Sequence, residues 1–231
     1  MALRWVRRRA RLVGVITSST DLDRAVRMRR PPDLFEIRLD CLTEALDQLQ
    51  NKLPRLRAPL IITARHPHEG GAGKLSTRQR RDLLAGFLDH ADYLDVELRS
   101  ARPLQRLLAI AERKKVGRII SFHDFKSTPS AKVLAVKERA ARAHRADIFK
   151  VATRTDTPME LGRLLDFTTN KRTDLPLAVM GIGKLGAVSR VALARAGSSL
   201  VYGSLSMGGD IEGQLSLEEL WALGIGAVAK N

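Results

Sequence analysis

The sequence predicts an α/β fold, specifically a single-domain (β/α)8 TIM barrel that takes in residues 1–231. Three observations support this prediction. Eight short apolar runs rich in β-branched residues start at intervals of roughly 22 to 33 residues, about the length of one strand–helix unit of such a barrel. Helix-like segments lie between the runs, and strands that alternate with helices form parallel sheets. The length of 231 residues suits one barrel of eight units.

Each apolar run has the length of a strand. The expected strands cover residues 12–17, 34–39, 60–64, 93–98, 118–122, 147–152, 177–180 and 199–202. Three of the helices between them are also marked clearly. The segment 76–91 has leucines at helical spacing and Thr77 as its candidate cap, 103–115 places Pro103 near its first turn, and 130–145 is rich in alanine and in charges of both signs. No linker or change of composition divides the chain, so we expect one domain.

Composition narrows the class of protein. A hydrophobic content of 44% supports a real core and excludes a disordered chain. The single cysteine, Cys41, cannot form an intramolecular disulfide and suits a reducing compartment. The apolar stretch 12–16 is too short for a signal peptide or a membrane span. We therefore expect a cytoplasmic protein with no membrane partner.

The formal net charge of +15 favours anionic partners. Four arginines lie between residues 7 and 11, within a short basic N-terminal extension that covers about residues 1–11. Such a run binds nucleic acid in some proteins, but here aromatic residues make up only 4% of the chain and none is interleaved for base stacking. We interpret the run as a solvated tail and expect no nucleic-acid partner.

Lys150 is the most informative residue, because it lies inside the apolar run 146–152. Lysine is rarely buried without a partner or a function. Burial favours the neutral amine, which attacks a ketone to form a Schiff base. His123 directly follows the expected strand 118–122 and is a candidate proton carrier near neutral pH. The alternatives are that Lys150 reaches to solvent at the rim and that His123 is structural.

Polar residues cluster where the expected strands end. In a parallel barrel these ends meet on one face, where active sites form. The convergent set is Glu36, Arg38, Asp40, Arg65, Glu69, Asp95, Glu97, His123, Lys150, Arg190 and Gln214.

Two glycine motifs resemble cofactor sites without completing them. Residues 181–186 spell G-x-G-x-x-G after an expected strand, but too little chain follows for a dinucleotide-binding half, so a tight turn near the ligand is the better interpretation. Residues 70–74 lack the spacing of a phosphate loop. The close spacing of His66, His68 and Glu69 suits a metal site poorly. We expect no metal and no cofactor.

Taken together, these motifs resemble those of the type I 3-dehydroquinate dehydratases, a family of Schiff-base enzymes of the shikimate pathway. The resemblance runs from about residue 12 to residue 214, in the same order along the chain. The matching pieces are FEIRLD at 35–40, Arg65 with EGG at 69–71, DVEL at 95–98, SFHDF at 121–125, FKVA at 149–152, MG at 180–181 with SR at 189–190, and GQ at 213–214.

The resemblance implies a dehydration of 3-dehydroquinate to 3-dehydroshikimate. Lys150 would form an imine with the C3 ketone, and the cationic imine would serve as the electron sink, so that no cofactor is needed. His123 would remove the C2 proton and protonate the departing C1 hydroxyl. Glu69 would orient and tune His123.

The resemblance also implies the substrate contacts and a homodimer. Glu36, Arg38 and Arg65 would hold the ring substituents, Arg190 would pair with the substrate carboxylate, and Gln214 would belong to a closing loop. One position departs from the family pattern: Asp210 stands four residues before Gln214, where the family often has serine. An aspartate there repels a carboxylate, so it would instead hydrogen-bond a ring hydroxyl or stay outside the pocket.

Two other functions fit part of the sequence. A different class I aldolase-type barrel would use Lys150 on another keto acid, because the barrel fold alone does not fix the reaction. A basic nucleic-acid-binding protein would account for the charge alone and would bind with an affinity that falls steeply with salt.

Overall fold

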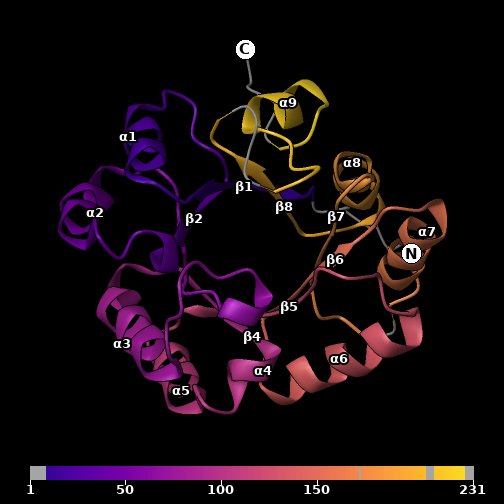
Figure 1. The fold of residues 1–231 in the computed structure, drawn as a ribbon, viewed down its shortest axis with the longest axis horizontal. Helices are drawn as coiled ribbons and strands as arrows, with labels where there is room; N and C mark the ends of the chain where they lie inside the picture. The colour runs from indigo at the N-terminus through magenta and orange to yellow at the C-terminus, as the bar shows by residue number, and fades with distance from the viewer. Residues whose placement is uncertain (1–8, 172, 207–210, 227–231) are drawn as a thin grey trace, which may run out of the picture.

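The structure is a computed structural model that describes residues 9–171, 173–206 and 211–226. Within these residues, eight parallel strands form a barrel that is ringed by helices (Figure 1). The strands are β1 (Arg11–Ile16), β2 (Leu34–Arg38), β3 (Leu60–Thr63), β4 (Tyr93–Glu97), β5 (Gly117–Asp124), β6 (Ile148–Arg154), β7 (Leu177–Ile182) and β8 (Leu200–Ser204). The predicted TIM barrel is therefore confirmed.

Helices follow the strands and cover the outside of the barrel. The α-helices are α1 (Ser19–Arg27), α2 (Leu46–Lys52), α3 (Thr77–Phe87), α4 (Leu98–Ala101), α5 (Gln105–Arg113), α6 (Ala131–Ala143), α7 (Pro158–Thr169), α8 (Gly186–Ala196) and α9 (Leu217–Ala222). Short 3-10 helices are η1 (Leu39–Cys41), η2 (Leu53–Arg55), η3 (Pro67–Glu69) and η4 (Leu88–His90). None of the helices in the described ranges is both long and apolar enough to cross a bilayer.

The barrel has one seam. Backbone ladders join neighbouring strands in the order β7-β6-β5-β4-β3-β2-β1-β8, so no ladder joins β7 to β8 in the described chain. Hydrogen bonds between β7 and the two serines that precede β8, Ser198 and Ser199, link these strands instead. The Ser199 amide donates to the Leu177 carbonyl at 2.7 Å, and the Val179 amide donates to the Ser198 hydroxyl at 2.9 Å. The ring is thus closed by contacts at the start of β8.

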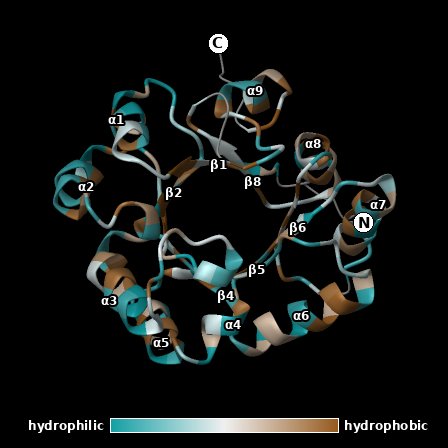
Figure 2. Ribbon diagram, in the orientation of Figure 1, coloured by the Kyte–Doolittle hydropathy of each residue, from teal (hydrophilic) through white to brown (hydrophobic). Residues whose placement is uncertain are grey.

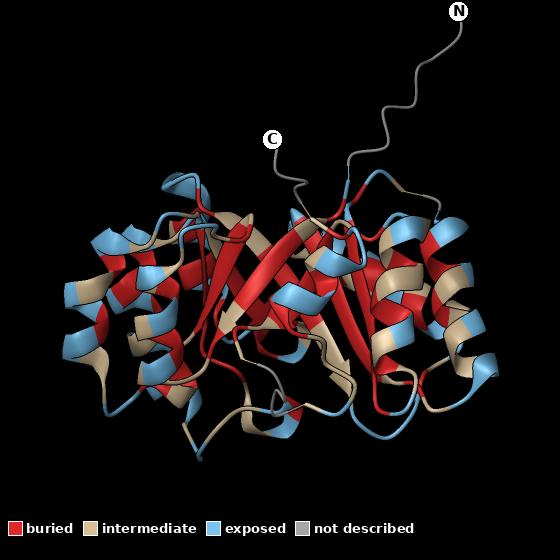
Figure 3. Cartoon of the chain, turned by 90° about the horizontal axis from the view of Figure 1, so that it is seen from above, coloured by how far each residue is buried: buried red, intermediate tan, exposed pale blue. Residues whose placement is uncertain are grey.

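Apolar side chains fill the barrel and the layer outside it. The interior cluster includes Val13, Leu34, Ile61, Ile119 and Tyr202, and a larger cluster lies between the sheet and the helices. Figure 2 shows hydrophobic strands at the centre, and Figure 3 shows that the helices turn their buried faces toward the sheet. Burial on both faces explains why the strands appear in the sequence as continuous apolar runs.

Several boundaries differ from those predicted. Ser76, and not Thr77, caps α3, because its hydroxyl accepts from the Gln79 amide while the Gln79 side chain accepts from the Ser76 amide. Helix α5 begins at Gln105, after Pro103. Strand β1 begins at Arg11, one residue before the predicted strand 12–17, and Arg9 pairs with Asp33 at 2.8 Å.

Candidate active site

A cavity of about 780 Å³ opens at the carboxyl ends of the strands. Eight of the predicted site residues line it, and they come from six of the strands and the segments that follow them. They are Glu36, Arg38, Arg65, Glu69, His123, Lys150, Arg190 and Gln214. Asp210, the ninth, lies outside the described residues. The fold therefore brings distant polar residues to one site, as predicted from their positions at strand ends.

Lys150 lies in the middle of β6 and is only 4% exposed. Its Nζ donates to Glu36 Oε1 at 3.1 Å and to Asp95 Oδ2 at 3.0 Å. The same atom lies 3.9 Å from the centre of the Tyr202 ring. The predicted burial is confirmed. Two carboxylates and an aromatic face thus surround the amine, a feature that burial alone did not predict.

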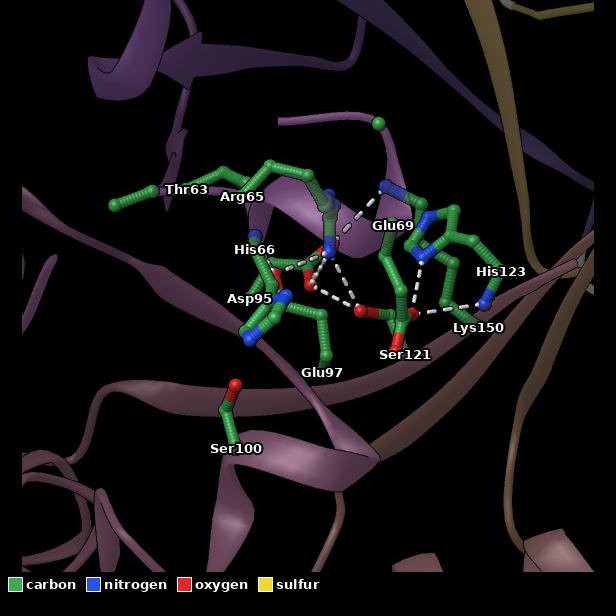
Figure 4. A network of polar contacts seen from close by, with 12 residues as sticks. Thr63, Arg65, His66, Glu69, Asp95, Glu97, Ser100, Ser121, His123 and Lys150 are labelled. Carbon is green, nitrogen blue, oxygen red and sulfur yellow. Dashed lines mark hydrogen bonds and ion pairs between the residues drawn. The ribbon is translucent and has the colours of Figure 1, made fainter. Parts of the chain in front are cut away.

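His123 is held by Glu69 (Figure 4). The Glu69 Oε2 atom accepts from the backbone amide of His123 at 3.0 Å and lies 3.0 Å from Nδ1 of its ring. We assign the ring proton to Nδ1 because a carboxylate oxygen only accepts. This leaves Nε2 as the free acceptor, the atom that a general base requires. Strand β5 runs on to Asp124, so His123 lies within the strand and not after it.

Burial and the surrounding charges shift the pKa values of His123 and Glu69 in opposite directions. Burial, followed by the positive charges of Arg65 and Lys150, holds the pKa of His123 well below its ordinary value. Burial, followed by the nearby Glu97 carboxylate, raises the pKa of Glu69 to about 7, although Arg99 lies 3.2 Å from Glu69 Oε1. The imidazole is therefore neutral near physiological pH and able to take up a proton.

Arg65 is surrounded by buried carboxylates (Figure 4). It is 2% exposed and binds Asp95 with both Nη atoms, each at 2.9 Å. It also contacts Glu36, Glu97 and Ser121. Burial opposes its charge, but Asp95 and Glu97 hold the pKa of Arg65 well above its ordinary value. Its Nη atoms thus bind protein oxygens, and a contact of Arg65 with a ring substituent of the substrate stays a prediction.

Two of these carboxylates, those of Glu36 and Asp95, are also the partners of Lys150. Burial alone would favour the neutral acid at Asp95, yet Arg65 and Lys150 hold the pKa of that carboxyl well below its usual range. Glu36 Oε1 also accepts from the Thr63 hydroxyl at 2.9 Å. Glu97 is in turn bound by the fully buried Arg80. A chain of buried ion pairs therefore connects the amine of Lys150 to the outer layer of the barrel.

Arg38 is held at the cavity edge by Asp40. Its Nε and Nη2 atoms donate to the two oxygens of Asp40 at 3.0 and 2.7 Å, and Nη2 also donates to the Gly70 carbonyl at 3.0 Å. Asp40 accepts in addition from the backbone amides of Arg65 and Ala72. Asp40 thus orders three segments around the cavity.

Arg190 differs from Arg65 although it is equally buried, at 2% exposure. It lies in α8 and donates only to backbone carbonyls, with no carboxylate partner in the described chain. The acceptors are the carbonyls of Tyr202 at 3.1 Å, Gly181 at 3.1 Å, Gly186 at 3.0 Å and Gly213 at 2.7 Å. Burial without a counter-charge lowers the pKa of Arg190 to about 10.

The glycines of the 181–186 motif allow the backbone segments around Arg190 to approach one another closely. A Cβ on Gly186 would lie 2.9 Å from the Gly213 carbonyl oxygen, too close for any side chain. Gly183 has φ of +91°, in the region that favours glycine. The motif therefore builds a tight turn that lets the loop of Gly213 and Gln214 approach Arg190, in agreement with the prediction.

Two residues at the site, Arg80 and Tyr202, were not predicted, and Asp95 was predicted to lie there without an assigned role. Asp95 and Arg80 belong to the charge network, and Tyr202 lies under the Lys150 amine. The position of Asp95 within the expected strand 93–98 already placed it in the predicted convergent set. The tyrosine in the run 199–202 carries no signal of a role, because aromatic residues are common in strands.

The two adjacent histidines do not form a metal site in the described chain. His66 and His68 stack with their ring centres 5.3 Å apart, and His66 Nδ1 accepts from the His68 amide at 3.1 Å. Among the residues that the structure describes, no group of three His, Cys, Asp or Glu side chains is arranged to hold a metal ion.

Comparison with known proteins identifies the family. The family model of type I 3-dehydroquinase matches residues 13–223. The 3-dehydroquinate dehydratase of Enterococcus faecalis is 33% identical over 202 residues, which are 81% of this chain and 79% of that protein. The 3-dehydroquinate dehydratase of Methanothermobacter thermautotrophicus is 32% identical over 178 residues, covering 76% and 77%.

Comparison with solved structures points to the same family. The crystal structure of 3-dehydroquinate dehydratase from Geobacillus kaustophilus superimposes with a TM-score of 0.83 and 25% identity, covering 93% of this chain and 89% of that one. The enzyme structure from Enterococcus faecalis gives 0.80 and 26%, covering 93% and 92%. With this barrel, this cavity and these matches, the chain belongs to the type I 3-dehydroquinase family of enzymes.

Proposed function

We propose that this enzyme dehydrates 3-dehydroquinate to 3-dehydroshikimate through an imine on Lys150. The observation that carries the proposal is the placement of a buried amine and a neutral, oriented imidazole in one cavity. The reaction requires both groups, one to activate the ketone and one to move protons.

The first stage forms the imine. The Lys150 amine, once it has given up a proton, attacks the C3 carbonyl carbon, and loss of water from the carbinolamine gives a cationic imine. That positive charge takes the place of the ammonium charge between Glu36 and Asp95, at 3.1 and 3.0 Å from Nζ. The site is therefore prepared for a cation before and after the bond forms.

The second stage eliminates water. His123 Nε2 removes the C2 proton, and the electron pair of that C–H bond moves into the imine to give a neutral enamine. The pair then returns to expel the C1 hydroxyl, which leaves as water with the proton from His123. Hydrolysis of the product imine by a second water releases 3-dehydroshikimate and restores Lys150. The low pKa of His123 suits it to release the proton it has taken.

Arg190 is the proposed site of the substrate carboxylate. Its Nη2 atom makes no hydrogen bond to the described residues, and its charge has no acidic partner among them. A carboxylate would neutralise this buried charge. Arg38 and Glu36 of β2 are the proposed contacts of the ring hydroxyls, and Gln214 would contact the ligand from the loop that Arg190 anchors.

Three further proposals concern the setting of the enzyme. We infer a cytoplasmic location, which the single cysteine supports. We infer a homodimer on the strength of the family resemblance. We infer that Asp210 contributes to substrate binding, because it lies four residues before Gln214. Sedimentation of the purified chain tests the dimer, and the KM of Asp210→Ser tests the third.

The His123→Ala variant tests the assigned roles. We expect it to retain imine formation, detected by borohydride reduction, and to lose at least about a hundredfold in turnover. Turnover is measured from the absorbance of the conjugated product. Loss of substrate binding with the chemical step unchanged would contradict the role of His123. Formation of an adduct with a different keto acid, and none with 3-dehydroquinate, would favour an aldolase-type reaction.

A further inference from the structure

Tyr202 is a buried residue that the proposed chemistry leaves unused. It lies in β8, is 3% exposed and belongs to the interior cluster of the barrel while also lining the cavity. Its hydroxyl is buried and has no hydrogen-bond partner among the residues that the structure describes. An unpartnered buried phenol costs stability, so a favourable contribution of Tyr202 must come from its ring or its backbone.

The ring lies against the reactive amine. Lys150 Nζ is 3.9 Å from the ring centre, well within the distance of about 6 Å at which a cation is attracted to an aromatic face. The attraction is strong when both groups are buried, and Lys150 is 4% exposed. The carboxylates of Glu36 and Asp95 bind the same nitrogen. The amine is thus held by two carboxylates and one aromatic face.

The backbone of the same residue holds the second cation of the site. The Tyr202 carbonyl accepts from Arg190 Nε at 3.1 Å. One residue of β8 therefore contacts both the amine, through its ring, and the guanidinium, through its backbone. Strand β8, which makes both contacts, is joined to β1 by a regular ladder.

We propose that Tyr202 is a positioning residue that holds the Lys150 nitrogen in its cationic forms at a fixed place relative to Arg190. This inference rests on the proposed function, since it assumes that Lys150 forms the imine. The ring attracts the ammonium before the reaction and the iminium after it, and has no such attraction for the free amine. It therefore sets where the nitrogen lies and at what pH it becomes free to attack.

The phenol itself plays no part in this role. Burial, followed by the carboxylates of Glu36 and Asp95, holds the pKa of the Tyr202 hydroxyl well above its ordinary value, so the ring stays neutral. The other charged groups around the amine come from different elements: Glu36 from β2, Arg65 after β3, Asp95 from β4 and His123 from β5. Substitutions at Tyr202 leave all of these in place.

The test is the pH dependence of adduct formation with 3-dehydroquinate and cyanoborohydride, measured by intact mass. Tyr202→Phe keeps the ring, and we expect it to keep the midpoint of the wild-type profile. Tyr202→Leu removes the aromatic face, and we expect its midpoint to fall by about one pH unit, since the ammonium form loses the attraction of the ring. Pentafluorophenylalanine at 202 keeps the ring shape and reverses its electrostatic face, so the same fall is expected even if the leucine variant folds poorly.

The outcomes separate this inference from the function on which it rests. If the leucine and pentafluorophenylalanine proteins both keep the wild-type midpoint, the positioning role is overturned while the imine stands. A wild-type protein that forms no adduct during turnover would overturn the imine and the positioning role together. A shift in the phenylalanine variant equal to that in the leucine variant would assign the effect to the hydroxyl, against the proposal.

Discussion

The two sides of the cavity satisfy their buried charges differently. On the side of β2 to β5, Arg65 is surrounded by Glu36, Asp95 and Glu97, so the protein itself neutralises the arginine. On the side of β7 and β8, Arg190 binds only carbonyls, and the Tyr202 hydroxyl has no partner in the described chain. The first side is complete without a ligand, whereas the second gains a counter-charge when an anion binds. This contrast distinguishes an arginine whose charge the protein neutralises from one whose charge a bound anion would neutralise.

The largest expected effect is a loss of stability on the side of β2 to β5, where the protein itself neutralises Arg65. Arg65→Met removes a buried cation from Asp95 and Glu97, which keep Lys150 and Arg80 as partners, and we expect the free energy of unfolding to fall by about 3–5 kcal/mol, as for other broken buried pairs. Urea unfolding measures it. Arg78→Met is the matched control, because Arg78 is an exposed arginine paired with Asp82 at 3.8 Å and should cost less than about 0.5 kcal/mol. Equal losses in the two variants would show that the network contributes little.

The next largest effect is a loss of substrate affinity on the side of β7 and β8, where Arg190 lies. Arg190→Gln removes the cation proposed to bind the substrate carboxylate, and we expect kcat/KM to fall about a hundredfold, chiefly through KM. Arg195→Gln, on the exposed face of the same helix, should leave KM unchanged. Steady-state kinetics on 3-dehydroquinate decides between them. An unchanged KM in Arg190→Gln would mean that the substrate anion binds elsewhere.

A smaller effect concerns the hydrogen-bonded pair of Glu69 and His123. The raised pKa of Glu69, about 7, means that its carboxylate forms only as the pH rises through that value. Since the carboxylate holds the Nδ1 proton of His123, turnover should rise through the same range and be lost as the pH falls below it. Glu69→Gln should lower turnover about tenfold to a hundredfold and remove this limb of the pH–rate profile. A variant that keeps the limb with the same midpoint would exclude Glu69 as its source.

The smallest effect is a gain of stability. Tyr202→Phe removes a buried hydroxyl that has no partner among the described residues, and we expect the free energy of unfolding to rise by about 1 kcal/mol. Tyr93→Phe is the matched control, because the Tyr93 hydroxyl accepts from Arg11 Nη2 at 3.3 Å and its removal should bring no gain. Thermal unfolding compares the two. A loss of stability in Tyr202→Phe would show that its hydroxyl is satisfied in solution.

The positions of the strands could be predicted because both faces of each strand are buried and the apolar runs are nearly continuous. The site could be located because parallel strands bring their carboxyl ends to one face. The seam between β7 and β8 could not be predicted, because the runs 177–180 and 199–202 look no different from the others. Ser76 and Thr77 are both good caps, and only the hydrogen bonds with Gln79 decide between them.

Individual roles within the site were harder to predict than its location. Arg65 and Arg190 are both arginines near strand ends, and no pattern in the sequence predicts that protein carboxylates neutralise one and not the other. What separates them is cross-strand register: Thr63 of β3 pairs with Asp95 of β4, which brings the carboxylate near Arg65. Arg190 instead reaches the carbonyls of three glycines from the interior of a helix. Such neighbours are set by tertiary packing and not by local sequence.

The most direct test of the account is the identity of the residue that carries the substrate during turnover. Borohydride is added to the enzyme with 3-dehydroquinate, and the digested protein is analysed by peptide mass. The account predicts a reduced adduct on the peptide that contains Lys150 and none in Lys150→Met. Full turnover with Lys150 unmodified, or an adduct on a different lysine, would contradict it.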